Sequence, residues 1–326
     1  MLCFFVDKIF FIVYNYIINK YKGDVMKLFN PDYNSTVGSV RDPMVVLFNG
    51  TYYLVATTEP YWNGPNPGVK MWSSPDLITW NFEGLMVDSV DISEDAPCKD
   101  RFWAPELFIG KNKFFITFNA KNDSENYSAP LKSFVAVSDN ITGPYNIIPK
   151  PLVDVESTTN DAHLFRDDDG TVWLFCNLEG SIIAQRFDED SASTYGDYIT
   201  LIKKGEEGSW DSVGIEGSFV VKRDGKLYLW YSSWSRGYEM GLAVSDGMDK
   251  PFVKMPCNPI ISCSNPESEN DSKEVTNCGH NSCLKLKDGR DVVIYHGNMN
   301  GKKESICIEE ISYPPVPHRP PAYFEI

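Results

Sequence analysis

The stretch that decides the fold is residues 224–233, DGKLYLWYSS, in which a turn dipeptide precedes alternating aromatic and aliphatic positions. Asp-Gly supplies the positive φ angles of a type I′ turn, and the alternation that follows it is typical of a half-buried strand. Four further segments have the same form: Asn49-Gly50 before TYYLVAT, Lys111-Asn112 before KFFITFN, Asp169-Gly170 before TVWLFC, and Asp288-Gly289 before RDVVIYHG. The sequence therefore predicts five β-hairpins.

The five turns recur about every sixty residues, which is the spacing of a repeat architecture. A second repeat, Val-Ser-Asp at 137–139 and again at 244–246, fits the third strand of two repeats, and residues 69–74 fit a third copy. We therefore predict an all-β fold, a five-bladed β-propeller in a single domain that spans residues 26–326. The proline-rich stretch from Pro314 to Pro321 is expected to be an irregular closing tail.

Residues 1–25 are set apart as an N-terminal extension of doubtful structure. Their apolar run, residues 9–18, is too short to span a bilayer, and no small-residue cleavage site follows it. Eight cysteines without a CxxC pair are too sparse for a disulfide scaffold, although a bridge from Cys278 to Cys283 stays open. We expect free thiols and a cytoplasmic protein rather than a secreted one.

The composition excludes some partners. The chain has 326 residues, with 30 Lys and Arg against 45 Asp and Glu, and hence a net charge of −15. Such an acidic surface repels phosphate backbones and anionic lipids, so we expect neither a nucleic-acid nor a membrane partner. Aromatic residues reach 13%, which suits strand packing and also provides flat rings for stacking on sugars.

Chemically distinctive residues lie eight or nine positions before each turn, where the innermost strand of each blade would begin: Asp42, Trp103, Asp161, Glu216 and His280. Innermost strands run parallel around the axis of a propeller, so their first residues converge at one mouth of the channel. Clustered carboxylates acquire separate pKa values, and one can then donate a proton while another activates water. This pattern favours the hydrolysis of a glycosidic bond.

The sequence resembles glycoside hydrolase family 43, a group of five-bladed propellers that act on arabinose- and xylose-containing glycans. The resemblance spans about Val40 to Tyr295, and its markers are Arg41-Asp42-Pro43, Ser74-Pro-Asp76-Leu-Ile-Thr-Trp80, Trp103-Ala-Pro-Glu106, Asp161 with Phe165-Arg-Asp-Asp-Asp-Gly170, Ile215-Glu216-Gly217 and Gly279-His280. The chain departs from the family at Ser218, where proline is common, and at Asn160, where an apolar residue is common.

The resemblance implies specific roles and an inverting mechanism. Asp42 would be the general base, Glu216 the general acid, and Asp161 the residue that tunes the pKa of the acid and orients the substrate. His280 would belong to a hydrated calcium site on the axis, held through water molecules, although no cofactor is expected to be required. We further expect Trp103, Trp62 and Arg41 to contact the substrate, with Trp62 on a loop at residues 61–67 that borders the pocket.

The predicted reaction is the release of terminal α-L-arabinofuranosyl residues from arabinose-containing oligosaccharides. A β-D-xylosidase or an endo-arabinanase of the same fold is the alternative among enzymes. A carbohydrate-binding or interaction propeller is the non-enzymatic alternative, but it has no need of carboxylates at the same position in separate blades. A sialidase is disfavoured because the Asp-box-like segment at residues 74–80 occurs once, and a serine hydrolase because no G-x-S-x-G segment occurs.

Overall fold

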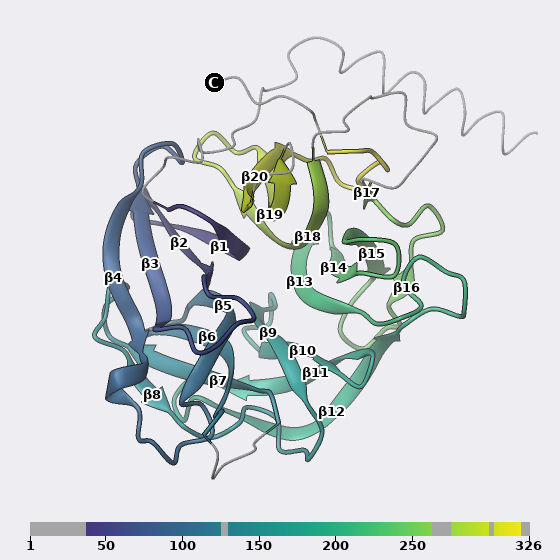
Figure 1. The fold of residues 1–326 in the computed structure, drawn as a ribbon. Coiled ribbons are helices and arrows are strands. Elements are labelled where there is room, and N and C mark those ends of the chain that lie inside the picture. The colour runs from purple at the N-terminus through teal and green to yellow at the C-terminus, as the bar shows by residue number, and fades with distance from the viewer. Residues whose placement is uncertain (1–36, 125–129, 263–274, 300–302, 321–326) are drawn as a thin grey trace, which may run out of the picture.

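Five β-sheets stand around a central axis in the computed structural model, like the blades of a propeller (Figure 1). The structure describes residues 37–124, 130–262, 275–299 and 303–320. In this part of the chain the only helical element is the 3₁₀ turn η1 (Ser89–Asp91), and no helix is long and apolar enough to cross a membrane. The predicted all-β, five-bladed propeller is confirmed. The extension expected at residues 1–25 lies outside the described residues.

Each blade is a meander in which the first strand lies innermost. Blade 1 consists of β1 (Val40–Phe48), β2 (Thr51–Thr58), β3 (Gly68–Ser74) and β4 (Asn81–Asp88). Blade 2 consists of β5 (Asp100–Ile109), β6 (Phe114–Lys121), β7 (Lys132–Ser138) and β8 (Asn146–Ile148). Blade 3 consists of β9 (Thr159–Arg166), β10 (Val172–Leu178), β11 (Ser181–Asp188) and β12 (Ser193–Lys203).

Blade 4 consists of β13 (Glu216–Arg223), β14 (Lys226–Ser233), β15 (Glu239–Ser245) and β16 (Val253–Lys254), with β17 (Ile261–Ser262) as a second partner of β15. Blade 5 consists of β18 (Val275–Lys285), β19 (Asp291–Met299) and β20 (Glu304–Glu310). The second repeat seen in the sequence falls on β7, β15 and β3, the third strands of blades 2, 4 and 1, as predicted.

The five sequence turns join the first two strands of each blade, but they are not all of one type. Asn49-Gly50 and Asp224-Gly225 have positive φ at both residues, as a type I′ turn requires. In the Asp169-Gly170 and Asp288-Gly289 loops only the glycine has positive φ, and backbone hydrogen bonds from Asp167 to Thr171 and from Leu286 to Arg290 enclose three residues. The prediction of type I′ turns is therefore wrong for blades 3 and 5, which have longer loops.

Apolar side chains fill the spaces between neighbouring blades. The alternation in the sequence sends one set of side chains of each sheet toward the blade before it and the other set toward the blade after it. One cluster, around Phe115, Leu174 and Phe187, joins blades 2 and 3, while another, around Phe175, Leu229 and Tyr231, joins blades 3 and 4. Burial of these faces fixes the position of each blade and hence the place where its inner strand begins.

The ring closes where blade 1 meets blade 5. Strand β1 packs against β18 and β19, and Ser282 donates a hydrogen bond from its hydroxyl to the carbonyl of Pro43 at 2.9 Å. The C-terminal tail runs beside blade 4, where His318 exchanges backbone hydrogen bonds with Ile260 and Ser262. Cys278 and Cys283 do not form a disulfide with each other, so the bridge left open by the sequence is absent.

The difference between turns can be tested with two exposed asparagines. Asn49 has a φ of 47°, whereas Asn112, in the corresponding turn of blade 2, is not among the residues with positive φ. Replacing Asn49 with Ala should lower the free energy of unfolding by about 1 kcal/mol, because a Cβ-bearing residue other than Asn or Asp resists the left-handed conformation. Asn112→Ala is the matched control and should leave it nearly unchanged in denaturant titrations. Equal losses would contradict the assigned turn geometry.

Candidate active site

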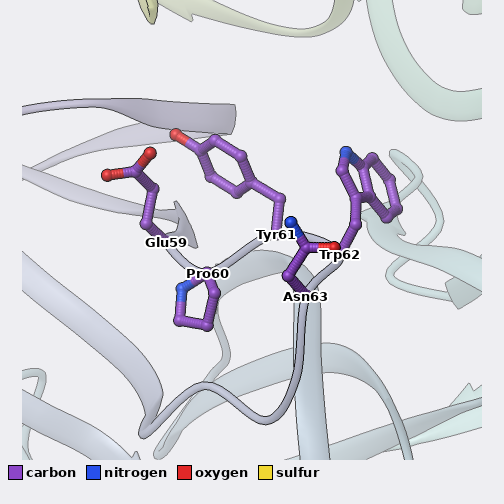
Figure 2. A pocket seen from close by; sticks show the side chains of 5 residues that line it. All are labelled: Glu59, Pro60, Tyr61, Trp62 and Asn63. Atoms are coloured by element: carbon purple, nitrogen blue, oxygen red, sulfur yellow. The ribbon is translucent and has the colours of Figure 1, made fainter.

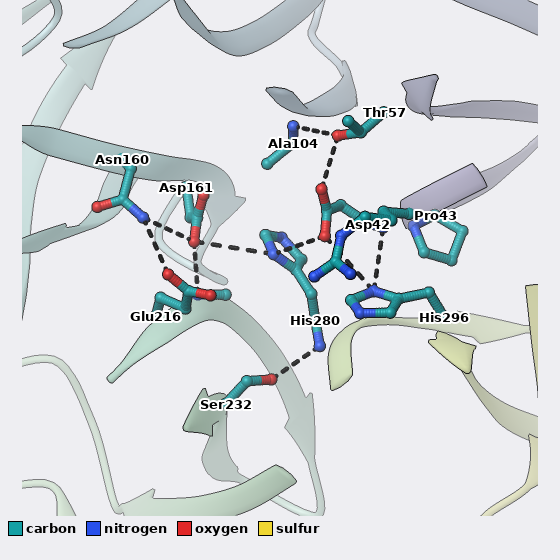
Figure 3. Close-up of polar contacts among 12 residues, drawn as sticks. Asp42, Pro43, Thr57, Ala104, Asn160, Asp161, Glu216, Ser232, His280 and His296 are labelled. Atoms are coloured by element: carbon teal, nitrogen blue, oxygen red, sulfur yellow. Dashed lines mark hydrogen bonds and ion pairs between the residues drawn. The ribbon is translucent and has the colours of Figure 1, made fainter. Parts of the chain in front are cut away.

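The inner strands bring four of the predicted residues together. Asp42 lies in β1, Asp161 in β9 and His280 in β18, while Glu216 begins β13. Figure 3 shows His280 between Asp42 and Asp161, with Glu216 beside Asp161. The Nδ1 atom of His280 lies 3.3 Å from Oδ1 of Asp42 and 3.8 Å from Oδ2 of Asp161. Residues that are far apart in the sequence therefore share one cluster.

Each inner strand is interrupted near this cluster by a shift in the register of its pairing. At each shift one residue has a left-handed backbone, with φ between 42° and 63°; these bulge residues are Asp42, Ala104, Asp161, Gly217 and His280. A β-bulge re-aims the side chains around it, and the left-handed conformation is unfavourable for most residue types other than glycine, asparagine and aspartate. A left-handed bulge that recurs at one level of all five blades, including at Ala104 and His280, points to a functional centre.

Two of the predicted residues lie one position away from the bulge. Trp103 and Glu216 each precede the bulge residue of their blade, which is Ala104 in blade 2 and Gly217 in blade 4. The bulge residue lies eight positions before the last turn residue in blades 1, 2 and 4, and nine positions before it in blades 3 and 5, whose loops are longer. Counting back from the turns therefore predicted the correct level of the channel, but in blades 2 and 4 it selected the residue before the bulge residue.

A second set of polar residues holds the bulges in place. They lie on the second strand of each blade, seven residues after the turn: Thr57, Asn119, Asn177, Ser232 and His296. Four of them accept the backbone N–H of the bulge residue in the next blade: Ala104 to Thr57 Oγ1 (2.6 Å), Asp161 to Asn119 Oδ1 (2.8 Å), His280 to Ser232 Oγ (2.8 Å) and Asp42 to His296 Nδ1 (3.2 Å). These contacts link successive blades around the channel.

The junction of blades 3 and 4 departs from this pattern. The N–H of Gly217 donates to Oδ2 of Asp161 at 2.9 Å, and the Oδ1 atom of Asn177 is buried without a hydrogen-bond partner. The amide of Asn177 instead donates to Oδ1 of Asn160 at 2.7 Å. At this junction a carboxylate of the cluster itself provides the link between blades.

Asp42 is buried and held as a carboxylate. Thr57 donates its hydroxyl to Oδ2 of Asp42 at 2.6 Å. Burial alone would raise the pKa of Asp42, but the positive charges of His280 and Arg41 and the hydrogen bond from Thr57 outweigh it, so the pKa lies below its usual value. Asp42 is therefore ionised at neutral pH and can accept a proton from water.

Glu216 has the opposite electrostatic environment. Burial, followed by the negative charges of Asp161 and Asp42, raises the pKa of Glu216 to about 8. Tyr238 donates its hydroxyl to Oε1, and Asn160 approaches Oε2 at 3.5 Å. Glu216 therefore carries a proton at neutral pH, and its side chain keeps partial exposure toward solvent. It has the properties of an acid.

Asp161 is fixed by several donors. Its Oδ1 accepts a hydrogen bond from the amide of Asn119 at 2.7 Å, while Oδ2 accepts from Asn160 at 3.0 Å and from the backbone of Gly217 at 2.9 Å. A carboxylate with these partners is fixed in orientation. It places a negative charge beside Glu216.

His280 is surrounded by acidic groups. Burial would lower its pKa, but the negative charges of Asp42 and Asp161 outweigh burial and raise it. In the described part of the chain no group of three or more His, Cys, Asp or Glu side chains could hold a metal ion. These residues therefore fit no ion with several protein ligands, and a hydrated ion held through His280 alone stays a prediction.

The predicted substrate-binding residues contact one another where blades 1 and 2 meet. Trp62 and Trp103 stack with ring centroids 6.2 Å apart, and the guanidinium of Arg41 lies 5.5 Å from the Trp62 ring. The Nε1 atom of Trp103 donates to the carbonyl of Tyr61 at 2.8 Å, which ties the loop to β5. A pocket of about 430 Å³ lies along residues 59–63 of this loop (Figure 2).

Neither Tyr238 nor the residues seven positions after each turn were predicted from the sequence to belong to the site. Tyr238 lies in the loop that ends at β15, away from the counted positions, and no motif marks it. The second-strand residues share a spacing but not a residue type, since Thr, Asn, Ser and His all provide acceptors there. His163 is buried in β9, and its Nδ1 lies 2.6 Å from Oε2 of Glu106.

Known proteins share this architecture. A model of the family described as "Glycosyl hydrolases family 43" matches residues 34–314. The chain is similar to Beta-D-galactofuranosidase xynD of Aspergillus niger, with 26% identity over 79% of this chain and 74% of that protein. It is also similar to Xylosidase/arabinosidase 43B of Humicola insolens, with 23% identity over 78% of this chain and 46% of that protein, so it spans less than half of that relative.

A solved structure described as a thermostable family-43 glycoside hydrolase is similar in fold. It has a TM-score of 0.72 and 29% sequence identity, and the match covers 87% of this chain and 93% of that one.

The role of the second-strand residues can be tested at Asn119, which both accepts the N–H of Asp161 and donates to its carboxylate. Asn119→Ala leaves both groups buried without these partners and should lower the free energy of unfolding by about 1–3 kcal/mol. The exposed Asn140 is a matched control, and Asn140→Ala should change it by no more than about 0.5 kcal/mol. Similar unfolding curves for the two variants would contradict a role for Asn119 in holding the bulge.

Proposed function

The chain belongs to glycosyl hydrolase family 43, and we propose that it releases terminal α-L-arabinofuranosyl residues from arabinose-containing oligosaccharides with inversion of configuration. The observation that carries the proposal is the separation of roles between two neighbouring carboxyls of the cluster. The pKa of Asp42 is lowered by neighbouring positive charges, while burial and negative charges raise that of Glu216 to about 8. Near neutral pH, one group is therefore a base and the other an acid.

In the proposed reaction Glu216 donates its proton to the glycosidic oxygen while the bond from that oxygen to the anomeric carbon breaks. The bonding electrons leave with the oxygen of the departing sugar. Asp42 takes a proton from a water molecule, whose oxygen bonds to the anomeric carbon from the opposite face. The reaction leaves Asp42 protonated and Glu216 ionised, and exchange with solvent restores both. Asp161 raises the pKa of Glu216 by its charge and orients the sugar.

A furanoside substrate is supported by the relative from Aspergillus niger, which is named a galactofuranosidase. The rings of β-D-galactofuranosides and α-L-arabinofuranosides have the same configuration and differ in the group attached at C4. The relative from Humicola insolens is named a xylosidase/arabinosidase, so a β-D-xyloside is the second candidate. A purely sugar-binding protein is disfavoured because binding alone requires neither a proton donor nor a separate base.

A panel of three substrates tests the specificity. We expect an aryl α-L-arabinofuranoside and short arabino-oligosaccharides to be cleaved with release of arabinose, and an aryl β-D-xyloside to be cleaved more slowly. Product analysis by chromatography would identify the released sugar. Exclusive formation of long oligomers from linear arabinan would contradict exo action, and faster cleavage of the xyloside would contradict the preference for arabinose.

The roles of the acid and the base can be separated with leaving groups of different basicity. Glu216→Gln should lower turnover by about 10²–10⁴-fold on oligosaccharides, because general acid catalysis contributes about that much. The loss should shrink sharply for a dinitrophenyl glycoside, whose leaving group departs without a proton. Asp42→Asn should abolish turnover on every substrate, because no group then activates the water.

The melting temperature of each variant serves as a control for folding. A loss in Glu216→Gln that is independent of the leaving group would contradict its assignment as the acid. We expect an activated leaving group to restore the turnover of Glu216→Gln but not that of Asp42→Asn.

A further inference from the structure

An exposed tryptophan lies beside Glu216 and has no part in the cluster described above. Trp234, in the connection between β14 and β15, is 42% exposed. Its ring lies so close to Gly214 that a Cβ atom added there would be 2.6 Å from Cη2 of the indole. Part of the ring is therefore held against the backbone two residues before Glu216, while the rest is open to solvent.

Trp234 is also linked to the acid through Tyr238. The rings of Trp234 and Tyr238 have centroids 6.4 Å apart and are inclined by 31°, and the hydroxyl of Tyr238 donates to Oε1 of Glu216. The guanidinium of Arg41 lies 5.4 Å from the Tyr238 ring and 5.5 Å from the Trp62 ring. These contacts form an arc of aromatic rings, in which Arg41 connects the Trp103 and Trp62 pair to Tyr238 and Trp234.

The position of Glu216 indicates which part of the substrate lies near each end of this arc. A general acid must approach the glycosidic oxygen, which leaves together with the departing sugar. A flat ring beside Glu216 therefore faces the departing sugar, whereas Asp42 approaches the anomeric carbon from the opposite side. An indole with an open face can stack on the C–H face of a pyranose or furanose ring.

We propose that Trp234 forms the wall of a leaving-group subsite, on which the second sugar of the substrate stacks. This inference rests on the proposed function of the same site. It identifies the substrate class as oligosaccharides of at least two sugar units, whose second unit contributes to transition-state binding. A simple alkyl glycoside lacks that unit and gains nothing from Trp234.

The test compares two substrates that share the sugar released by the wild type in the panel above: its disaccharide and its methyl glycoside. Trp234→Ala should lower kcat/KM for the disaccharide by about fivefold to tenfold, as expected for the loss of one stacking contact. It should leave kcat/KM for the methyl glycoside within about twofold. Trp234→Phe should retain most of the activity on the disaccharide, and it allows the test even if the alanine variant folds poorly.

Tyr195 provides the matched control, because it is 49% exposed in β12 of blade 3 and lies outside the cluster. Tyr195→Ala should leave both rates unchanged. Equal losses on the two substrates in Trp234→Ala, or no loss on either, would overturn the subsite while leaving the proposed function intact. A wild type that cleaves neither substrate would contradict the proposed function, and this inference with it.

Discussion

The arrangement of the site depends on one repeated interaction, the hydrogen bond from the backbone N–H of each bulge residue to a neighbouring blade. A left-handed residue in the middle of a strand loses its place in the pairing, and its buried N–H needs another acceptor. Thr57, Asn119, Ser232 and His296 each provide one from the second strand of the preceding blade. Because these bonds cross between blades, they fix the relative positions of side chains that come from distant parts of the chain.

The exception to this pattern lies where the chemistry is proposed to occur. At the junction of blades 3 and 4 the N–H of Gly217 donates to Asp161 rather than to Asn177. The same carboxylate therefore joins two blades and lies beside Glu216, whose pKa its charge helps to raise. Across the cluster, the positive charges of His280 and Arg41 lower the pKa of Asp42. Burial and neighbouring charges thus give two carboxyls in one channel opposite protonation states.

Much of the fold followed from the sequence, because turn dipeptides and strand alternation are local signals. The propeller and the level of the channel at which Asp42, Asp161 and His280 lie were predictable from the five turns, and the third strands from the Val-Ser-Asp repeat. Counting back from the turn selected Glu216 rather than the bulge residue Gly217, because the number of residues between bulge and turn depends on the length of the loop. The turn dipeptide does not reveal whether its loop has two or three residues. Tyr238 could not be foreseen, since it reaches Glu216 from a loop whose path depends on packing between blades.

The central claim is that Glu216 holds the proton near neutral pH while Asp42 does not, and the pH dependence of kcat/KM tests it most directly. The acid must be protonated, so activity should fall as the pH rises through the pKa of Glu216, which is about 8. The base must be ionised, so activity should also fall at acidic pH, below the usual range for an aspartate because the pKa of Asp42 is lowered. With a dinitrophenyl substrate, Glu216→Gln should lose the alkaline limb and keep the acidic one. An alkaline limb that persists in Glu216→Gln would contradict the account.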